Sequence, residues 1–113
     1  MPNLDLLIVA IKNRKPISFE YNKEGKIRGT RIGNPHAVFI FTSKTNVTST
    51  KIHIVQTDGV SDSKELKPFP DFRMFNIEDL TSMVVLEDSL SFEPHYEKYN
   101  PEWEGYINAI EKI

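Results

Sequence analysis

A chain of 113 residues is long enough for one domain with a modest core, and its mixture of charged (27%) and aromatic (11%) residues is typical of globular rather than disordered proteins. Cysteine is absent, which excludes disulfide frameworks, cysteine-ligated zinc and thiol nucleophiles and fits a reducing cytoplasm. The net charge is only -2, but residues 1–70 hold 11 Lys and Arg against 6 Asp and Glu, whereas residues 71–113 hold 3 against 10.

The first predicted element is a short amphipathic helix at the N-terminus. Its apolar residues recur three and four positions apart: Leu4, Leu7, Ile8 and Ile11. Asn3 is a candidate N-cap, and Pro16 ends the pattern. The apolar run LLIVAI is short and follows Asp5 rather than a basic start, so we expect no signal peptide, no membrane segment and a cytoplasmic protein.

Short strands are predicted next. Apolar and polar residues alternate over 17–21, and the following turn offers Gly25 for a positive-φ position. Three further β-rich segments are separated by Asn34-Pro35 and by the turn SKTN: KIRGTRIGN, HAVFIFT and NVTSTKIHIVQ. Alternation returns over 71–79, and SMVVLEDSLSF favours either a sixth short strand or an irregular cover. About five short strands in a meander are typical of a small antiparallel barrel.

A closing helix is predicted over about 101–113. Asn100 is a candidate cap, Pro101 suits the first helical position, and an apolar stripe follows: Trp103, Tyr106, Ile107, Ile110 and Ile113. The predicted fold is therefore mainly β (α+β), a single domain over 1–113. Its barrel core would span about 16–92, with a helix at each end.

Catalysis and metal binding have little support in the sequence. The three histidines, His36, His53 and His95, are far apart and lack metal-ligand spacing. No serine lies in a nucleophile elbow, and no glycine-rich loop could hold phosphates. We expect a protein that is not an enzyme and uses no metal or cofactor.

Basic residues interleave with strand aromatics in the first half of the chain. Arginine binds phosphate bidentately and flat rings stack on bases, so this composition suits an anionic partner, although buried rings and solvated charges would give the same pattern. Arg28 and Arg31 lie three apart on one predicted strand and hence on opposite faces. One of them must point inward, where it needs an acceptor: Glu20, an acidic residue of the second half or a bound anion.

The order of these segments resembles the WYL domain family, small SH3- or Sm-like β-barrels of bacteria and phage that sense ligands. The resemblance rests on IKNRKPISFEY, on the arginine-bearing strand before NP, on IHIVQTDGVSDS and on FRMFNIEDLTSMVVLEDSLSF, and it covers about residues 4–92. The pattern Arg73-x-Phe75-x-Ile77-x-x-Leu80 looks like the family's closing strand. The Trp-Tyr-Leu triplet, expected near residues 50–52, is absent, and Asn76 and Asp79 stand where many members have basic residues.

The resemblance implies a non-catalytic regulatory module that binds single-stranded nucleic acid or a nucleotide-like anion. Together with Arg28, the candidate ligand-binding residues carried over are Arg31, His36, Gln56, Ser61, Ser63 and Arg73. Transcription regulation would require a partner, because no helix-turn-helix is present. The alternative is a protein-interaction or homo-oligomerisation module that docks through a barrel edge or the Trp103 helix. Arg73 can bind a ligand or pair internally with Asp71, and the sequence leaves both open.

Overall fold

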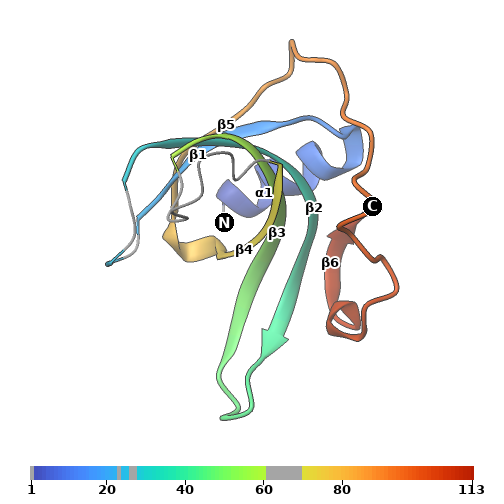
Figure 1. The fold of residues 1–113 in the computed structure, drawn as a ribbon. Coiled ribbons are helices and arrows are strands. Elements are labelled where there is room, and N and C mark those ends of the chain that lie inside the picture. Colours follow the sequence, from blue (N-terminus) through green and yellow to red (C-terminus); the bar gives the residue numbers. More distant parts are fainter. Residues whose placement is uncertain (1, 23, 26–27, 61–69) are drawn as a thin grey trace.

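The computed structural model describes residues 2–22, 24–25, 28–60 and 70–113. In this part of the chain, six strands form one antiparallel sheet in the order β4-β3-β2-β1-β5, with β6 paired to β2 (Figure 1). The elements are α1 (Pro2–Asn13), β1 (Ile17–Tyr21), β2 (Thr30–Thr42), β3 (Thr48–Gly59), β4 (Asp71–Asn76), η1 (Ile77–Asp79), β5 (Leu80–Val85), η2 (Glu104–Tyr106) and β6 (Ala109–Lys112).

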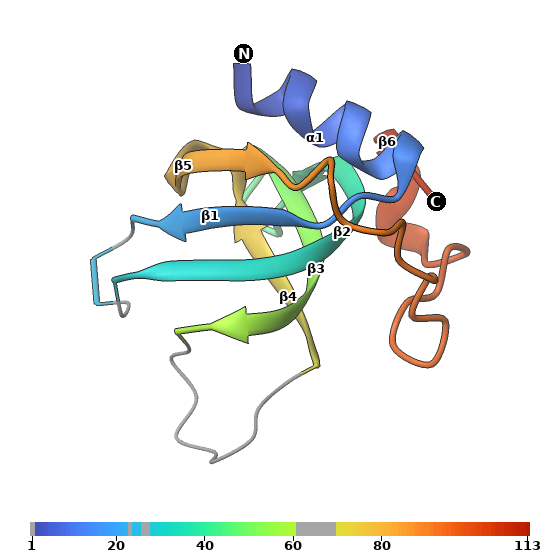
Figure 2. The ribbon, with the colours of Figure 1, turned by 90° about the horizontal axis from the view of Figure 1, so that it is seen from above.

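The predicted N-terminal helix is confirmed as α1, which crosses one face of the bent sheet (Figure 2). Its stripe of Leu7, Ala10 and Ile11 is buried against the sheet. Asn3 does not cap the helix, because α1 begins at Pro2; the Asn3 side chain instead donates a hydrogen bond to the Leu80 carbonyl at 2.9 Å. No helix in the described ranges is both long and apolar enough to cross a bilayer.

The main core lies between α1 and the concave face of the sheet. The predicted alternation over 17–21 is confirmed: Ile17, Phe19 and Tyr21 are buried and β1 pairs with both β2 and β5. Phe75 from β4 packs edge-on against Phe19 and Tyr21, with ring centroids 5.3 and 4.7 Å away. Such edge-to-face pairs combine apolar burial with favourable ring electrostatics, which ties β4 to β1 across the face.

A second apolar cluster lies on the opposite face of β2, β3 and β4. It contains Phe39 from β2 and two tyrosines of the C-terminal segment, Tyr99 and Tyr106, all of them buried. Side chains of a strand alternate between its two faces, so β2 can contribute Val38 to the main core and Phe39 to this cluster. The irregular chain of residues 86–108 therefore covers the face that α1 leaves open (Figure 2).

The predicted SH3/Sm-like barrel of about five strands is wrong. In the described residues the sheet is open, with β4 and β5 at its two edges and no pairing between them. Asn34-Pro35, which we expected to separate two strands, lies inside the single long strand β2. Register shifts, one of them between Pro35 and Ala37, accommodate the proline, which has no N–H to donate. One bent strand thus replaces two short ones, and its hairpin with β3 extends beyond the sheet (Figure 1).

The predicted C-terminal helix over 101–113 is also wrong, because this segment forms the turn η2 followed by strand β6. Asn100 does cap locally, since its side chain accepts a hydrogen bond from the Glu102 N–H at 3.0 Å, but no helix follows. The free edge of β2 beyond β1 decides the outcome: β6 pairs with Ala37–Phe39 there, and the Ile113 N–H donates to the His36 carbonyl at 3.0 Å. These hydrogen bonds satisfy backbone groups at the edge of β2, which would stay unpaired if the C-terminal segment formed a helix.

Candidate functional site

A cavity of about 390 Å³ lies between the β3–β4 pair and the C-terminal segment, a volume typical of small-molecule sites. Two strands and one irregular segment, distant in sequence, build its walls. The residues that line it are His53, Phe72, Met74, Lys98, Asn100, Trp103 and Tyr106. We call it the aromatic pocket.

Flat rings form most of the pocket wall. The His53 ring lies 4.6 Å from Phe72 and 5.4 Å from Trp103, measured between centroids, and Trp103 stands perpendicular to Tyr106 at 5.0 Å. Phe39 packs behind His53 at 4.8 Å. Trp103 keeps 37% of its surface exposed, so a ligand can reach its indole. The accessible indole of Trp103 can stack on a flat ligand, because aromatic faces favour stacking.

The backbone around Gly105 fixes the position of Trp103. A Cβ atom at Gly105 would lie 2.3 Å from carbons of the indole, so only glycine allows the ring to pack this closely against the turn. The Trp103 N–H donates to the Asn100 carbonyl at 3.1 Å, and the Tyr106 N–H donates to the Trp103 carbonyl at 3.0 Å. The turn thus holds both rings in the pocket wall.

The two polar groups deepest in the wall are neutral at pH 7. His53 Nδ1 and the Tyr106 hydroxyl share a hydrogen bond. Burial, with a smaller contribution from His36, lowers the pKa of His53 to about 4. Burial, followed by the neighbouring Tyr99, raises the pKa of Tyr106 above its ordinary value. Both groups therefore remain uncharged, because desolvation disfavours the charged form.

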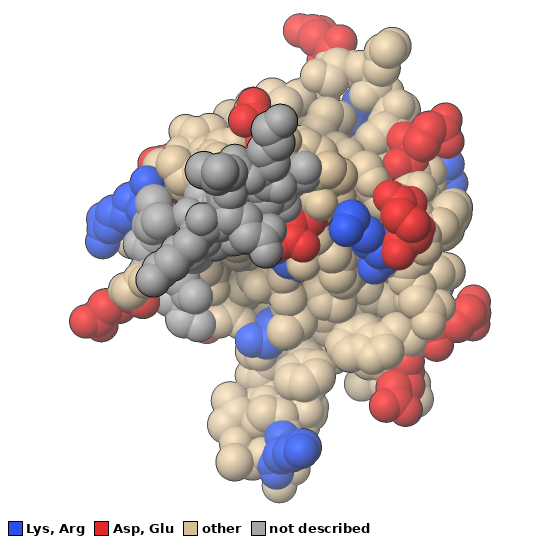
Figure 3. Space-filling model, in the orientation of Figure 1, with Lys and Arg blue, Asp and Glu red and all other residues tan. Residues whose placement is uncertain are grey.

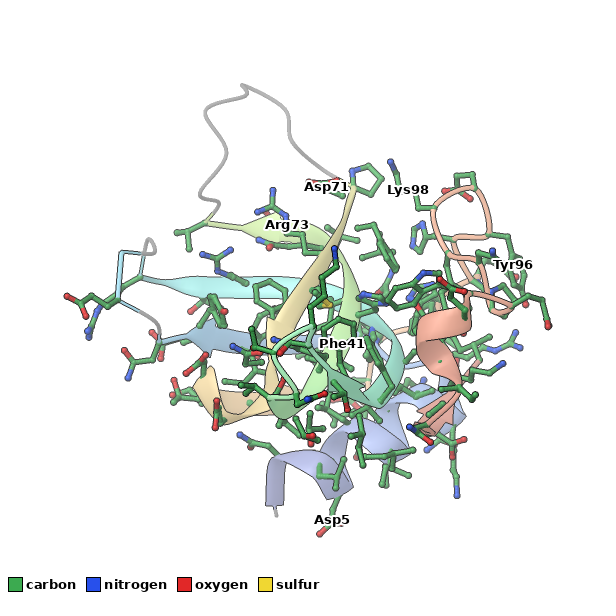
Figure 4. All side chains as sticks on the ribbon, turned by 90° about the horizontal axis from the view of Figure 1, so that it is seen from below. Asp5, Phe41, Asp71, Arg73, Tyr96 and Lys98 are labelled. Atoms are coloured by element: carbon green, nitrogen blue, oxygen red, sulfur yellow. The ribbon has the colours of Figure 1, made fainter. Side chains whose placement is uncertain are left out.

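Lys98 supplies the positive charge of the pocket. It is the charged residue among the described lining residues, and it comes from the irregular segment facing the start of β4. Figure 4 shows its side chain near the end of β4 that carries Asp71. A lysine ammonium is a compact point charge with three donors, which suits phosphate or carboxylate.

Comparison of the chain with protein-family models, with curated proteins and with solved structures found no match in any of the three. In the described ranges, no group of three or more His, Asp or Glu side chains could hold a metal ion. The site is therefore interpreted from its geometry.

His36, a predicted ligand residue, ties the C-terminal segment to β2. Its Nδ1–H donates to the Asn34 carbonyl at 2.8 Å, and its Nε2 accepts from the His95 backbone N–H at 3.0 Å. Asn34 in turn donates from its amide to the His95 ring at 2.9 Å. Burial lowers the pKa of His36 to about 4, so both bonds involve the neutral ring. These contacts are internal to the protein.

Arg31 and Gln56, two further predicted site residues, meet in the interior and are both fully buried. Arg31 Nη1 donates to Gln56 Oε1 at 3.5 Å, and the guanidinium lies 5.7 Å from the Phe75 ring centroid. The Gln56 amide donates to the Val60 carbonyl at 2.7 Å, which fixes the chain after β3. Arg31 lies on β2 and is buried, as expected for one arginine of the pair. Arg28 is exposed and precedes β2, so the expectation that both lie on one strand is wrong.

Arg73 lies on β4 and forms an ion pair with Asp71, at 3.3 Å from Nη2 to Oδ2 (Figure 4). Its register partner on β3 is Ile54, which places Arg73 on the same face as Gln56. The structure thus groups three of the predicted residues, Arg31, Gln56 and Arg73, on one face. Arg31 contacts Gln56 and Arg73 contacts Asp71, so each of these described contacts joins two residues of the protein and involves no ligand.

The remaining predicted residues lie elsewhere. Arg28 borders a small cavity of about 120 Å³ beside Glu20 and Thr81, far from His36 in the sheet. Ser61 and Ser63 lie outside the described residues. Blue and red side chains are interspersed on the face in Figure 3, without one continuous basic surface among the atoms it colours.

Sequence reasoning missed most of the aromatic pocket. Trp103 and Tyr106 were assigned to a helix stripe, although Trp103 is the only tryptophan in the chain. Phe72 and Met74 belong to the segment 71–79, whose alternation predicts a strand but no site. The available signal was Lys98, a lone cation within an acidic and aromatic segment, but nothing in the sequence placed it opposite β4.

Proposed function

We propose that this chain is a non-catalytic, cytoplasmic binding module that takes a flat anionic ligand of nucleotide type in the aromatic pocket. The observation that carries the proposal is a cavity of about 390 Å³ with aromatic walls and Lys98 at its edge. The likeness to ligand-sensing WYL domains, whose matching segments include His53, Phe72 and Met74 of the pocket wall, agrees with a sensory role.

Two interactions would contribute to binding: stacking of the base on the aromatic wall and attraction of the phosphate to Lys98. A base stacked on the accessible ring of Trp103 would gain about 1–3 kcal/mol. The phosphate of the same ligand would lie toward Lys98, where the ammonium can donate hydrogen bonds to it. A flat ring joined to an anionic group therefore uses both features of the pocket, whereas an apolar ring alone uses one.

A mononucleotide suits the charge around the pocket better than a long single strand does. A strand continuing beyond the pocket would pass the C-terminal segment, whose acidic residues outnumber its basic ones. Residues 93–113 hold Glu93, Glu97, Glu102, Glu104 and Glu111 against Lys98 and Lys112. Since strand binding depends on neutralising successive phosphates, this segment disfavours it.

The state of His53 supports binding rather than catalysis. A general base works best when its pKa lies near the operating pH. The pKa of His53, about 4, lies well below neutral pH, and its Nδ1 is engaged by Tyr106. We assign these two groups to ligand recognition and to no chemical step.

A protein-docking module is the second candidate. It is favoured by apolar side chains exposed on the β2–β3 hairpin, notably Ile40 and Val47. Docking of a partner there would respond to changes at Val47 and would leave the pocket unaffected.

Ligand binding to the pocket can be followed by tryptophan fluorescence, because Trp103 lines the pocket and is the only tryptophan in the chain. We expect adenosine, cytidine, guanosine and uridine monophosphates to change Trp103 fluorescence on titration, with calorimetry as the second measurement. Lys98→Ala should weaken binding by about fivefold, as expected for ~1 kcal/mol from a partly solvated charge pair. Lys44→Ala, which changes an exposed lysine on the β2–β3 turn, is the matched control and should bind normally.

Added salt should weaken binding to the parent protein more than to Lys98→Ala. A failure of every monophosphate to bind at low salt would refute the proposal. Tight binding of an oligonucleotide without binding of monophosphates would move the site away from this pocket.

A further inference from the structure

The hydrogen bond between His53 and Tyr106 fixes which ring nitrogen of His53 carries the proton. The contact joins His53 Nδ1 to the Tyr106 hydroxyl. An imidazole nitrogen with a free lone pair is a stronger acceptor than a phenol oxygen, and a phenol is a good donor. The favoured arrangement has Tyr106 O–H donating to an unprotonated Nδ1. Neutral His53 then carries its proton on Nε2.

Nε2–H is therefore a hydrogen-bond donor at the pocket wall. His53 lines the cavity, and among the described residues no hydrogen bond engages its Nε2. His53 Nε2 is not among the fully buried polar atoms that lack a partner, so it is accessible from the cavity. A ligand that displaces water from this wall must supply an acceptor in its place, because a donor left unsatisfied after desolvation is costly.

Asn100 presents a donor to the same cavity for a similar reason. Its Oδ1 already accepts a hydrogen bond from the Glu102 N–H at 3.0 Å. The amide Nδ2, which has no hydrogen-bond partner in the described ranges, remains for a ligand. His53, Asn100 and Lys98 therefore each offer the cavity a hydrogen-bond donor: the ring Nε2–H, the amide Nδ2 and the ammonium group.

We propose that the aromatic pocket selects flat heteroaromatic anions whose ring edge carries hydrogen-bond acceptors, and that His53 Nε2–H is the specificity-determining donor. This inference rests on the proposed function, because it concerns the same pocket. It goes further by naming what the ring edge must carry: ring nitrogens or carbonyls, opposite a neutral donor. Tyr106 is a positioning residue that acts through His53.

The tautomer can be measured without any ligand. In protein labelled with ¹⁵N-histidine, the ring-nitrogen shifts at pH 7 should show His53 protonated at Nε2 and unprotonated at Nδ1. Tyr106→Phe removes the hydroxyl, and we expect its His53 shifts to indicate a mixture of tautomers. Protonation at Nδ1 in the parent protein would overturn the inference whether or not nucleotides bind.

Ligand selection is tested with adenosine monophosphate and its 1-, 3- and 7-deaza analogues, each of which replaces one ring nitrogen by C–H at nearly constant shape and charge. At least one analogue should bind about tenfold more weakly, as expected when a buried donor loses its acceptor. His53→Phe keeps an aromatic ring in the wall but lacks the donor, so it should bind that analogue and the parent nucleotide equally.

The outcomes separate the two proposals. No binding of adenosine monophosphate to the parent protein would count against the proposed function. Binding with all analogues equal, or discrimination that persists in folded His53→Phe, would overturn the role of His53 alone. If His53→Phe does not fold, Tyr106→Phe provides the comparison, and its discrimination should be weaker than that of the parent.

Discussion

At the scale of single residues, the molecule depends on two histidines that are buried and neutral. His36 holds the Asn34 carbonyl and the His95 N–H at once, and His53 accepts from Tyr106. Protonation of His36 would remove the lone pair on Nε2 that accepts from His95, and protonation of His53 would remove the acceptor at Nδ1. Each charge would also enter an apolar environment, which explains why both pKa values are low.

These two residues predict acid sensitivity. Their pKa values of about 4 in the folded protein compare with 6.5 for an unperturbed histidine. Between these values the unfolded chain binds more protons than the folded one, so the free energy of unfolding should fall as the pH falls from about 6.5 to 4. The loss should reach about 3 kcal/mol for each histidine and level off below about pH 4.

Urea unfolding at pH 7.5, 6, 5 and 4 measures this dependence. His53→Phe should lower stability at neutral pH through the lost hydrogen bond and should reduce the loss on acidification. Equal unfolding midpoints at pH 7.5 and 5 would show that neither histidine is held neutral in the folded protein.

At the scale of elements, β6 is short but closes the second apolar cluster. It pairs with β2 beyond the end of β1. The Tyr99 hydroxyl also donates to the carbonyl of Ile113 at 2.9 Å, just after the strand. The pocket wall of residues 98–106 is therefore fastened on both sides, by His36–His95 before it and by β6 after it.

We expect truncation after Asn108 to release this wall while leaving the main core folded. Trp103 emission should shift to longer wavelength, because the indole loses its neighbours, and the far-UV circular dichroism should keep most of its strand signal. Nucleotide binding should be lost. Ile110→Ser, which alters a partly exposed side chain of β6, is the matched control and should retain the parent emission. An unchanged spectrum in the truncated chain would show that β6 does not hold the wall.

At the scale of the whole molecule, one bent sheet separates two apolar clusters of different construction. The main core is built by α1 and regular strands around Phe19, Ile54 and Phe75. The second cluster, around Phe39 and Tyr99, is covered by irregular chain with few ladder bonds. Lys12 of α1 and Glu111 of β6 form an ion pair at 3.5 Å, so opposite charges from the two halves of the sequence do meet at the surface.

Hydrogen exchange should resolve these two parts. We expect the amides of His95 and Ile113 to exchange well before those of Phe19 and Ile54, because an irregular cover opens locally at lower free energy than a paired core. Tyr99→Phe should accelerate only the first pair, whereas Phe19→Ala, at a cost of about 3–5 kcal/mol, should accelerate both. Uniform protection across all four amides would indicate one cooperative unit.

Local periodicity in the sequence determined the elements whose burial is one-sided. The i, i+3, i+4 spacing from Leu4 to Ile11 identified α1, and the alternation from Ile17 to Tyr21 identified β1, since each pattern reports which face is buried. The same reasoning required Arg28 or Arg31 to point inward, and the structure buries Arg31, although Arg28 precedes β2 instead of sharing the strand. It also identified Asp71 as an available partner for Arg73.

The tertiary structure alone decided the open sheet, the strand β6 and the pocket. The apolar residues from Trp103 to Ile113 fit a helix locally, but a free edge on β2, about 70 residues earlier, offered backbone partners that only a strand can use. Proline at position 35 marks a break by local rules, yet a register shift lets β2 continue through it. His53, Phe72, Lys98 and Trp103 form one site because the sheet bends and residues 86–108 fold over it. Sequence spacing does not encode such convergence, since it depends on which distant surfaces bury one another.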